Sequence, residues 1–243
     1  MIEAVAMDHN NNVTELGMTV YRLPKEVRPV DRYALLIGAG SDEASANVDE
    51  LRKIFANPYL GQMSEGDVVA KKFEDLTAGN LDTTISEFAR MPRAGELAFV
   101  YIAAPANTSE AGLGSGGEVS LRDLQRSLEQ GLATNRIVLR LDLDWDTASE
   151  DLEVVEEMGT VPASWGVLTS AEFATPSMES NGRTLFGDAL VRALRGDEAD
   201  FSTLTIERLF DQVLNTVATE SGEKAIPDTD GRIDPNTVVV EYE

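Results

Sequence analysis

The sequence predicts an α/β domain, in which a mostly parallel central sheet carries helices on both faces, preceded by a separate N-terminal β-hairpin. Three observations lead to this prediction. Runs of consecutive apolar residues, which are typical of strands buried on both faces, recur along the chain. Amphipathic helical patterns lie between them. A strand and helix alternation of this kind is typical of a parallel sheet covered on both sides.

The first half of the main domain begins with the clearest strand. The apolar run Tyr33–Ile37 leads into a glycine turn at Gly38–Gly40, and an amphipathic helix is expected after it. Later, a second apolar run predicts another buried strand, and Ser120 is a suitable N-cap for the helix after it. The expected elements are a helix at Asp42–Ala56, a weaker strand at Val68–Phe73, a short helix at Leu81–Phe88, a strand at Leu97–Ile102 and a helix from Ser120 to Gln130.

The second half continues the same alternation. Two further apolar runs predict strands, and two long amphipathic segments predict helices. We expect strands at Ile137–Leu141, Gly166–Thr169 and Val238–Tyr242, helices at Ala148–Met158, Arg183–Leu194 and Leu204–Val217, and an exposed loop at Ser221–Asn236.

The first thirty residues form a separate arm in this interpretation. Ile2–Met7 and Val13–Leu23 flank a turn-like stretch, His9–Asn12, and this arrangement predicts a β-hairpin. Pro24 and Pro29 separate it from the rest of the chain. We therefore divide the chain into an N-terminal hairpin arm, residues 1–30, and a main domain, residues 31–243.

Composition restricts the function. The chain has 243 residues, enough for one large domain or two small ones, and it contains no cysteine, which excludes disulfides and a thiolate nucleophile. With 20 basic and 43 acidic residues the net charge is −23, which disfavours nucleic acid and anionic membranes as partners. The acidity fits either solubility in a saline habitat or a surface for a basic partner. No membrane span or secretory leader is expected, and we expect a cytoplasmic location.

Several segments resemble one family in order and spacing, from about Asp31 to Gly196. The resemblance is carried by Arg32–Gly38, Asn47–Phe55, Leu76–Ile85, Gly95–Tyr101, Ile137–Asp142, Val167–Ala171 and Asn181–Leu190. Together these are similar to the caspase-like peptidases, the group that includes metacaspases and bacterial caspase homologues. The resemblance implies a caspase-like three-layer sandwich.

The resemblance also locates the two catalytic positions. The family places a histidine after the strand Leu97–Ile102, and Ala104 stands there in this chain. The nucleophilic cysteine belongs two residues after Asp142, and Asp144 stands there. Alanine moves no proton, and a carboxylate without a base is a poor nucleophile for a peptide bond. His9, the only histidine, is far away in sequence. The chain is therefore expected to be a pseudoenzyme, with no catalytic residues.

The expected function is a protein–protein interaction or regulatory scaffold in a prokaryotic signalling, stress or defence system, a context that the resemblance alone implies. The predicted contact residues are Asp142, Asp144, Trp145 and Asp146. In metacaspase-type relatives the aspartate at position 142 helps to line a pocket for a basic side chain. A solvated or helix-capping carboxylate is an equal alternative for Asp142, and core packing is the alternative for Trp145.

Three other interpretations stay open. Asp142, Asp144 and Asp146 could bind calcium, or serve a metal-dependent hydrolase, but Thr147 stands where a calcium loop needs glycine, and an exposed acidic loop is the alternative. Asp228–Asp234 also has part of a calcium-loop pattern, and a plain turn explains it as well. Finally, the chain could be a flavodoxin-like ligand-binding domain, which we expect to differ in strand order.

Overall fold

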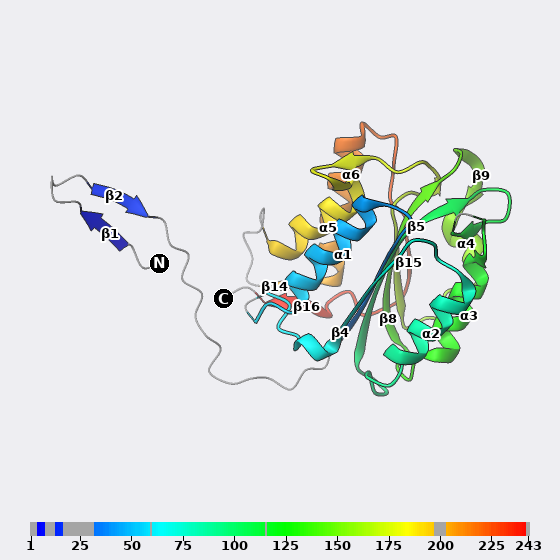
Figure 1. The fold of residues 1–243 in the computed structure, drawn as a ribbon, viewed down its shortest axis with the longest axis horizontal. Coiled ribbons are helices and arrows are strands. Elements are labelled where there is room, and N and C mark those ends of the chain that lie inside the picture. The colour runs from blue at the N-terminus through cyan, green and yellow to red at the C-terminus, as the bar shows by residue number, and fades with distance from the viewer. Residues whose placement is uncertain are drawn as a thin grey trace.

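One central sheet dominates the computed structural model, which describes residues 32–58, 60–114, 116–196 and 203–240, and the backbone alone of residues 4–7, 13–16 and 241 (Figure 1). Five strands of this sheet are parallel and an edge strand is antiparallel. They are β3 (Arg32–Ala39), β4 (Val68–Phe73), β5 (Leu97–Asn107), β8 (Arg136–Trp145), β10 (Trp165–Thr169) and the antiparallel β15 (Thr229–Gly231). Two short strands, β6 (Gly112–Leu113) and β7 (Val119–Ser120), extend it from the end of β5.

The strand order across the sheet is β15-β10-β8-β5-β3-β4. Counted along the chain from β3, the parallel strands therefore lie in the order 2-1-3-4-5. Flavodoxin-like domains share this order. The strand order therefore does not distinguish a flavodoxin-like domain from a caspase-like one, contrary to our expectation from the sequence. The neighbourhood of β5 and β8 matters most for function, because it brings the carboxyl ends of these strands side by side.

Helices cover both faces of the sheet, as the sequence predicted (Figure 1). On one face lie α1 (Asp42–Phe55), α5 (Leu185–Arg195) and α6 (Ile206–Ser221), and on the other α2 (Ala78–Phe88), α3 (Leu121–Gly131) and α4 (Val154–Met158). Each face has its own buried apolar cluster, and the alternating side chains of the strands feed the two clusters in turn. The mostly parallel α/β fold with three layers is thereby confirmed.

Polar N-caps explain where most of the helices begin. In five helices the residue before the first turn accepts a hydrogen bond from the backbone N–H three residues later, an interaction that typically stabilises a helix by about 1 kcal/mol. The capping residues are Ser41, Thr77, Ser120, Thr184 and Thr205. Gly196 and Gly222 adopt left-handed conformations that end α5 and α6.

Two predicted segments differ from the structure. Ala148–Met158 was expected to be one helix, but its first part is β9 (Ser149–Glu153), which pairs with β11 (Phe173–Ala174). The predicted loop Ser221–Asn236 contains β15, because Gly231 lets the chain approach β10 closely. A Cβ on Gly231 would lie 2.1 Å from the carbonyl oxygen of Trp165. The segment Asp228–Asp234, considered above as part of a calcium loop, thus supplies an edge strand.

The remaining short elements lie outside the central sheet. The final strand, β16 (Val238–Glu241), pairs with β14 (Thr203–Thr205), and the two strands of a small hairpin precede α5. These are β12 (Glu179–Ser180) and β13 (Arg183–Thr184), and a 3-10 turn, η1 (Glu65–Asp67), precedes β4.

The N-terminal hairpin predicted from the sequence is confirmed in its strands. β1 (Ala4–Met7) and β2 (Val13–Leu16) pair antiparallel, with Met7 opposite Val13. His9 and the rest of the predicted turn lie outside the described residues. Among the helices that the structure describes, none is long and apolar enough to cross a bilayer.

Candidate functional site

The two positions at which the resemblance places the lost catalytic residues, Ala104 and Asp144, lie near the ends of adjacent strands. In the parallel pairing of β5 with β8, Ala104 is opposite Leu143 and Pro105 is opposite Asp144. Neighbouring strands point opposed residues to the same face. Ala104 therefore lies with Leu143 in the buried cluster beneath α2 and α3. Asp144 points to the other face and accepts a hydrogen bond from the backbone N–H of Ser177 (2.8 Å). The strand ends meet, but the two side chains lie on opposite faces.

The three aspartates at the end of β8 bond to three different parts of the chain. Asp144 holds Ser177, whereas Asp146 accepts hydrogen bonds from the N–H and hydroxyl of Thr108 (3.0 Å each). These bonds, the backbone one foremost, lower the pKa of the Asp146 carboxyl. Within the described residues no group of three or more histidine or acidic side chains is arranged to hold a metal ion.

Two of the predicted contact residues are not at the surface. Asp142 is 2% exposed, so it cannot be part of an acidic contact face together with the exposed Asp144 and Asp146. Trp145 is also 2% exposed and packs in the core beneath α3 and α4. Of the two roles considered for Trp145, this agrees with core packing. The reason is the strand itself: β8 pairs with β10 as far as Leu141 and with β5 as far as Trp145, and helices cover both of its faces.

Asp142 is the centre of a buried polar network that joins four elements. Its Oδ2 accepts hydrogen bonds from the Tyr101 hydroxyl on β5 (2.6 Å), the Thr184 hydroxyl before α5, and Nδ2 of Asn47 on α1 (3.2 Å). The Asn47 amide also donates to both hydroxyl oxygens, at 2.8 Å each. Thr184 additionally caps α5 by accepting from the Gly187 N–H. One carboxylate oxygen thus holds α1, β5, β8 and α5 together.

Within the described part of the chain, no cation bonds to the Asp142 carboxylate. All three donors to its carboxylate are neutral groups. Burial, with a smaller contribution from the negative charge of Asp144, raises the pKa of Asp142 from 3.8 to about 6, against the hydrogen bonds of Thr184 and Tyr101. Burial also raises the pKa of Tyr101 well above its ordinary value, so Tyr101 remains a donor at neutral pH.

A small cavity adjoins this carboxylate at the carboxyl ends of β8 and β10. Its volume is about 20 Å³, which is room for one water molecule. Apart from Asp142, most of its wall is apolar or comes from the segment 175–178, and it includes Ser170, Leu185, Phe186, Val217 and Ala225. A buried anion beside an apolar cavity is an arrangement that favours a cationic ligand with an apolar stem.

Replacing Asp142 by asparagine is expected to remove a pH dependence of stability. The folded pKa of about 6 exceeds the unfolded value of 3.8, so the folded state binds more protons between these values and stability falls as pH rises through that window. Relative to the D142N variant, the wild type should lose about 2.4 kcal/mol of unfolding free energy from pH 4 to pH 7. Urea unfolding at a series of pH values measures it, and parallel curves for both proteins would contradict the assignment.

A second buried charge lies on the same face of β8. Arg140 is 2% exposed, and its Nε and one Nη have no hydrogen-bond partner. Its guanidinium lies over Phe99 (4.9 Å to the ring centre) and near Phe210 (5.8 Å) instead of against an anion. Burial lowers the pKa of Arg140 to about 9. Aromatic faces offset only part of the cost of burying a cation.

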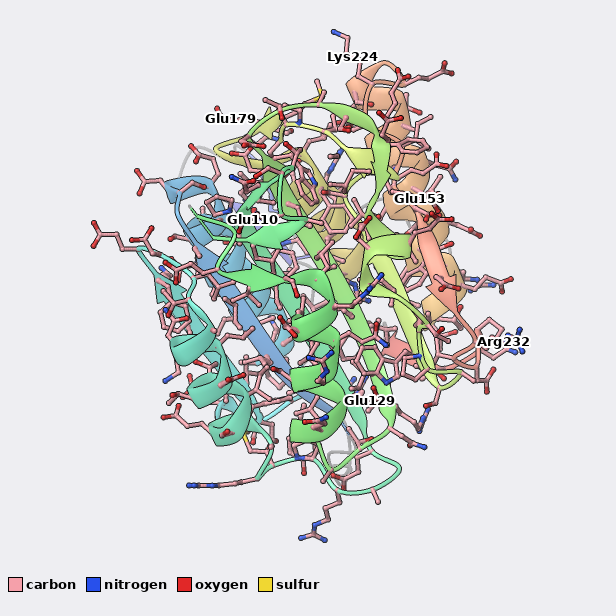
Figure 2. The ribbon with its side chains drawn as sticks, turned by 90° about the vertical axis from the view of Figure 1, so that its right-hand side faces the viewer. Glu110, Glu129, Glu153, Glu179, Lys224 and Arg232 are labelled. Carbon is pink, nitrogen blue, oxygen red and sulfur yellow. The ribbon has the colours of Figure 1, made fainter. Side chains whose placement is uncertain are left out.

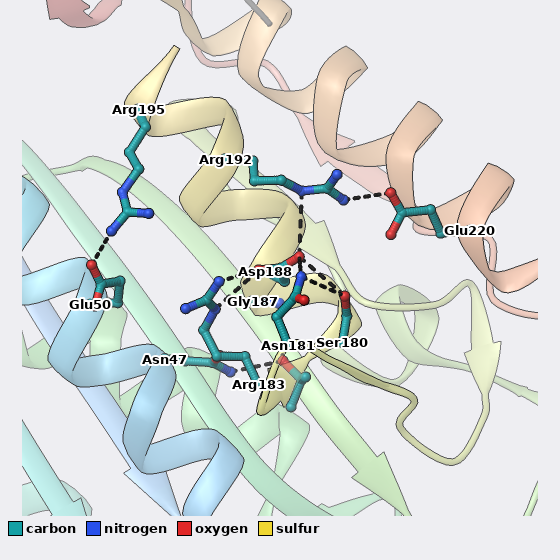
Figure 3. Close-up of polar contacts among 11 residues, drawn as sticks. Asn47, Glu50, Ser180, Asn181, Arg183, Gly187, Asp188, Arg192, Arg195 and Glu220 are labelled. Atoms are coloured by element: carbon teal, nitrogen blue, oxygen red, sulfur yellow. Dashed lines mark hydrogen bonds and ion pairs between the residues drawn. The ribbon is translucent and has the colours of Figure 1, made fainter. Parts of the chain in front are cut away.

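A second polar cluster fixes the start of α5 (Figure 3). Asp188, 1% exposed, accepts hydrogen bonds from Arg183, Ser180 and Asn181 and forms an ion pair with Arg192. Although burial opposes ionisation, these bonds keep the pKa of Asp188 below its ordinary value. This carboxylate is fully compensated by two cations. Asp142 differs from Asp188 in that only neutral groups donate hydrogen bonds to it.

A scan against protein-family models finds no match, and a search of curated proteins finds none. The candidate site is therefore argued from its geometry.

The flavodoxin-like alternative requires a ligand crevice at the point where the strand order reverses, outside the carboxyl ends of β3 and β5. Pro105, at the end of β5, lies directly against Gly40, at the end of β3. A Cβ on Gly40 would be 2.4 Å from the Pro105 ring. The ends of the two strands are thus in contact where such a ligand would enter.

Exposed acidic residues lie on several parts of the surface, and some of them lie together: burial and the negative charges of Glu156, Asp228 and Glu172 raise the pKa of Glu153. Glu110, Glu129 and Glu179 are exposed and project from well-separated elements (Figure 2).

Proposed function

We propose that this chain is a catalytically inactive caspase-like domain that binds a partner protein by receiving one of its basic side chains beside Asp142. The proposal combines the resemblance of the sequence with the geometry of the strand ends. The ends of β5 and β8 are adjacent, but Ala104 and Asp144 point to opposite faces of the sheet, so the place of the lost catalytic pair is proposed from the resemblance alone. The chain contains no cysteine that could act elsewhere.

The single observation that carries the binding proposal is the uncompensated carboxylate of Asp142. Burying an anion costs several kcal/mol unless a cation or sufficient hydrogen bonds offset the loss of hydration. Here three neutral donors converge on one oxygen, and the carboxylate lies in a cavity wall. A lysine or arginine side chain would supply the missing charge. Its apolar stem would contact Leu185, Phe186 and Val217.

Entry of such a side chain requires the cavity to widen. A volume of about 20 Å³ holds no lysine or arginine side chain. The wall segment 175–178 links β11 to β12 and is tied to β8 by the bond from Ser177 to Asp144. We propose that this segment moves outward when the partner binds. Asp144 then acts as the hinge contact, not as a nucleophile.

Peptide binding tests this function directly. A short capped peptide with one arginine between apolar residues should bind the wild type, and the same peptide with citrulline should bind at least about tenfold more weakly, because citrulline lacks the charge. The D142N variant should lose the preference for arginine. E129Q, which removes one exposed surface charge on α3 and does not line the cavity, is the control and should retain it. Equal binding of both peptides would rule the function out.

A peptidase assay tests the inactive state. The protein should not hydrolyse reporter peptides that carry arginine or lysine immediately before the scissile bond. Turnover that disappears in the D144A variant would overturn the pseudoenzyme proposal, whereas turnover that D144A leaves unchanged would indicate a contaminating protease.

A further inference from the structure

The groups around Asp142 determine how its charge responds to pH. From other elements, the groups that bond to it are Tyr101 on β5, Asn47 on α1 and Thr184 at the start of α5, and all three are uncharged. On α5, the acidic Asp188 is paired with Arg183 and Arg192. On β8 itself, Asp144 adds a negative charge. Arg140 stacks on Phe99 and forms no ion pair within the described residues.

Within this arrangement only neutral hydrogen-bond donors stabilise the ionised carboxylate, and the adjoining cavity is mainly apolar. Protonation therefore removes the sole charge that a cationic ligand could recognise there. Conversely, a cation placed in the cavity stabilises the ionised form, so binding and proton release are coupled by linkage.

We infer that the Asp142 site is a proton-linked receptor for a basic side chain, which binds its partner near neutral pH and releases it in mildly acidic conditions through protonation of Asp142. This inference rests on the proposed function and adds its regulation. It identifies the regulating group as a buried aspartate, since the chain has a single histidine, His9, which lies in the N-terminal arm.

The expected size of the effect follows from the carboxylate's titration. With a pKa of about 6 for the free protein, the ionised fraction falls about tenfold between pH 7 and pH 5. The affinity for the arginine peptide should fall by about the same factor if only the ionised form binds it. Exposed carboxylates titrate near pH 4 and contribute little in this range.

The test is calorimetric titration of the capped arginine peptide into the wild type from pH 5 to pH 7.5. At pH 6, in two buffers of different ionisation enthalpy, about half a proton should be released for each peptide bound. The D142N variant should show weak binding that does not change with pH. The H9Q variant removes the only histidine, the side-chain type that ordinarily titrates in this range. It should keep the full pH dependence of binding, because the proposal assigns that dependence to Asp142.

The outcomes separate the two proposals. Binding of the arginine peptide that is independent of pH and releases no proton would overturn the inference and leave the proposed function standing. A dependence that persists in D142N, or disappears in H9Q, would also overturn it. No binding at any pH would overturn the proposed function and this inference with it. The proton count in the wild type decides the question even if D142N does not fold.

Discussion

Replacing Gly187 by alanine is expected to destabilise the protein by about 4 kcal/mol, through overpacking and loss of the buried hydrogen bonds. Gly187 lies in the first turn of α5, where a Cβ would be 2.3 Å from Cγ and Nδ2 of Asn47. Asn47 is fully buried and cannot move aside without leaving Tyr101, Asp142 and Thr184. The new methyl group therefore separates α1 from α5 or breaks the network.

Thermal and urea unfolding would measure this loss. The midpoint temperature should fall by roughly 10 °C for a domain of this size. Gly79 is the matched control, because it also lies in the first turn of a helix, α2, but a Cβ there would meet nothing within 4 Å. G79A should be neutral or stabilising by about 0.5 kcal/mol. A G187A protein as stable as G79A would show that α1 and α5 are not in the close contact described.

Replacing Arg140 by methionine is expected to stabilise the protein by about 3 to 4 kcal/mol at neutral pH. The folded pKa of about 9 lies well below the ordinary value of arginine, so the unfolded state binds more protons above pH 9 and stability rises with pH there. Below pH 9 the buried guanidinium is charged, and its burial destabilises the folded state by at most about 5 kcal/mol. The contacts with Phe99 and Phe210 offset part of this cost. Methionine fills a similar volume without charge.

The neighbouring Arg136 provides a control of the opposite sign. It lies on the same strand, but it donates hydrogen bonds to the carbonyl oxygen of Gly95 and the hydroxyl of Thr237. R136M should therefore lose about 1 kcal/mol. Urea unfolding of both variants at pH 7.5 distinguishes them. A loss of stability in R140M would mean that Arg140 has an anionic partner in solution.

The sequence predicted the layers of the fold because consecutive apolar residues and polar caps are local signals. The runs at Tyr33–Ile37 and Leu97–Ile102 became β3 and β5, and Ser120 caps α3 as expected. β15 was missed because its three residues, Thr229–Gly231, are polar and its place depends on close approach to Trp165. β9 was missed because its mostly acidic sequence lacks the alternation of apolar and polar residues that is typical of a strand, and because its partner β11 is distant in sequence.

The candidate site was predictable only at its centre. Asp142 was singled out by the resemblance, but Asn47, Tyr101 and Thr184 give no individual signal and meet only through the topology, with Asn47 and Thr184 separated by 137 positions. The polar residues Tyr101 and Arg140, each inside an otherwise apolar strand, were a usable signal, because a polar side chain in a fully buried strand needs a partner. Which face of β8 each aspartate occupies required the register.

The first and last strands of the main domain adjoin each other. A side-chain nitrogen of Arg32, at the start of β3, donates to the backbone oxygen of Val239 on β16. A short linker could therefore join the two ends, and new ends could be opened at an exposed loop, giving a circular permutant with the same contacts. For the same reason the domain could be inserted as a cassette into a surface loop of a host protein without forcing that loop apart.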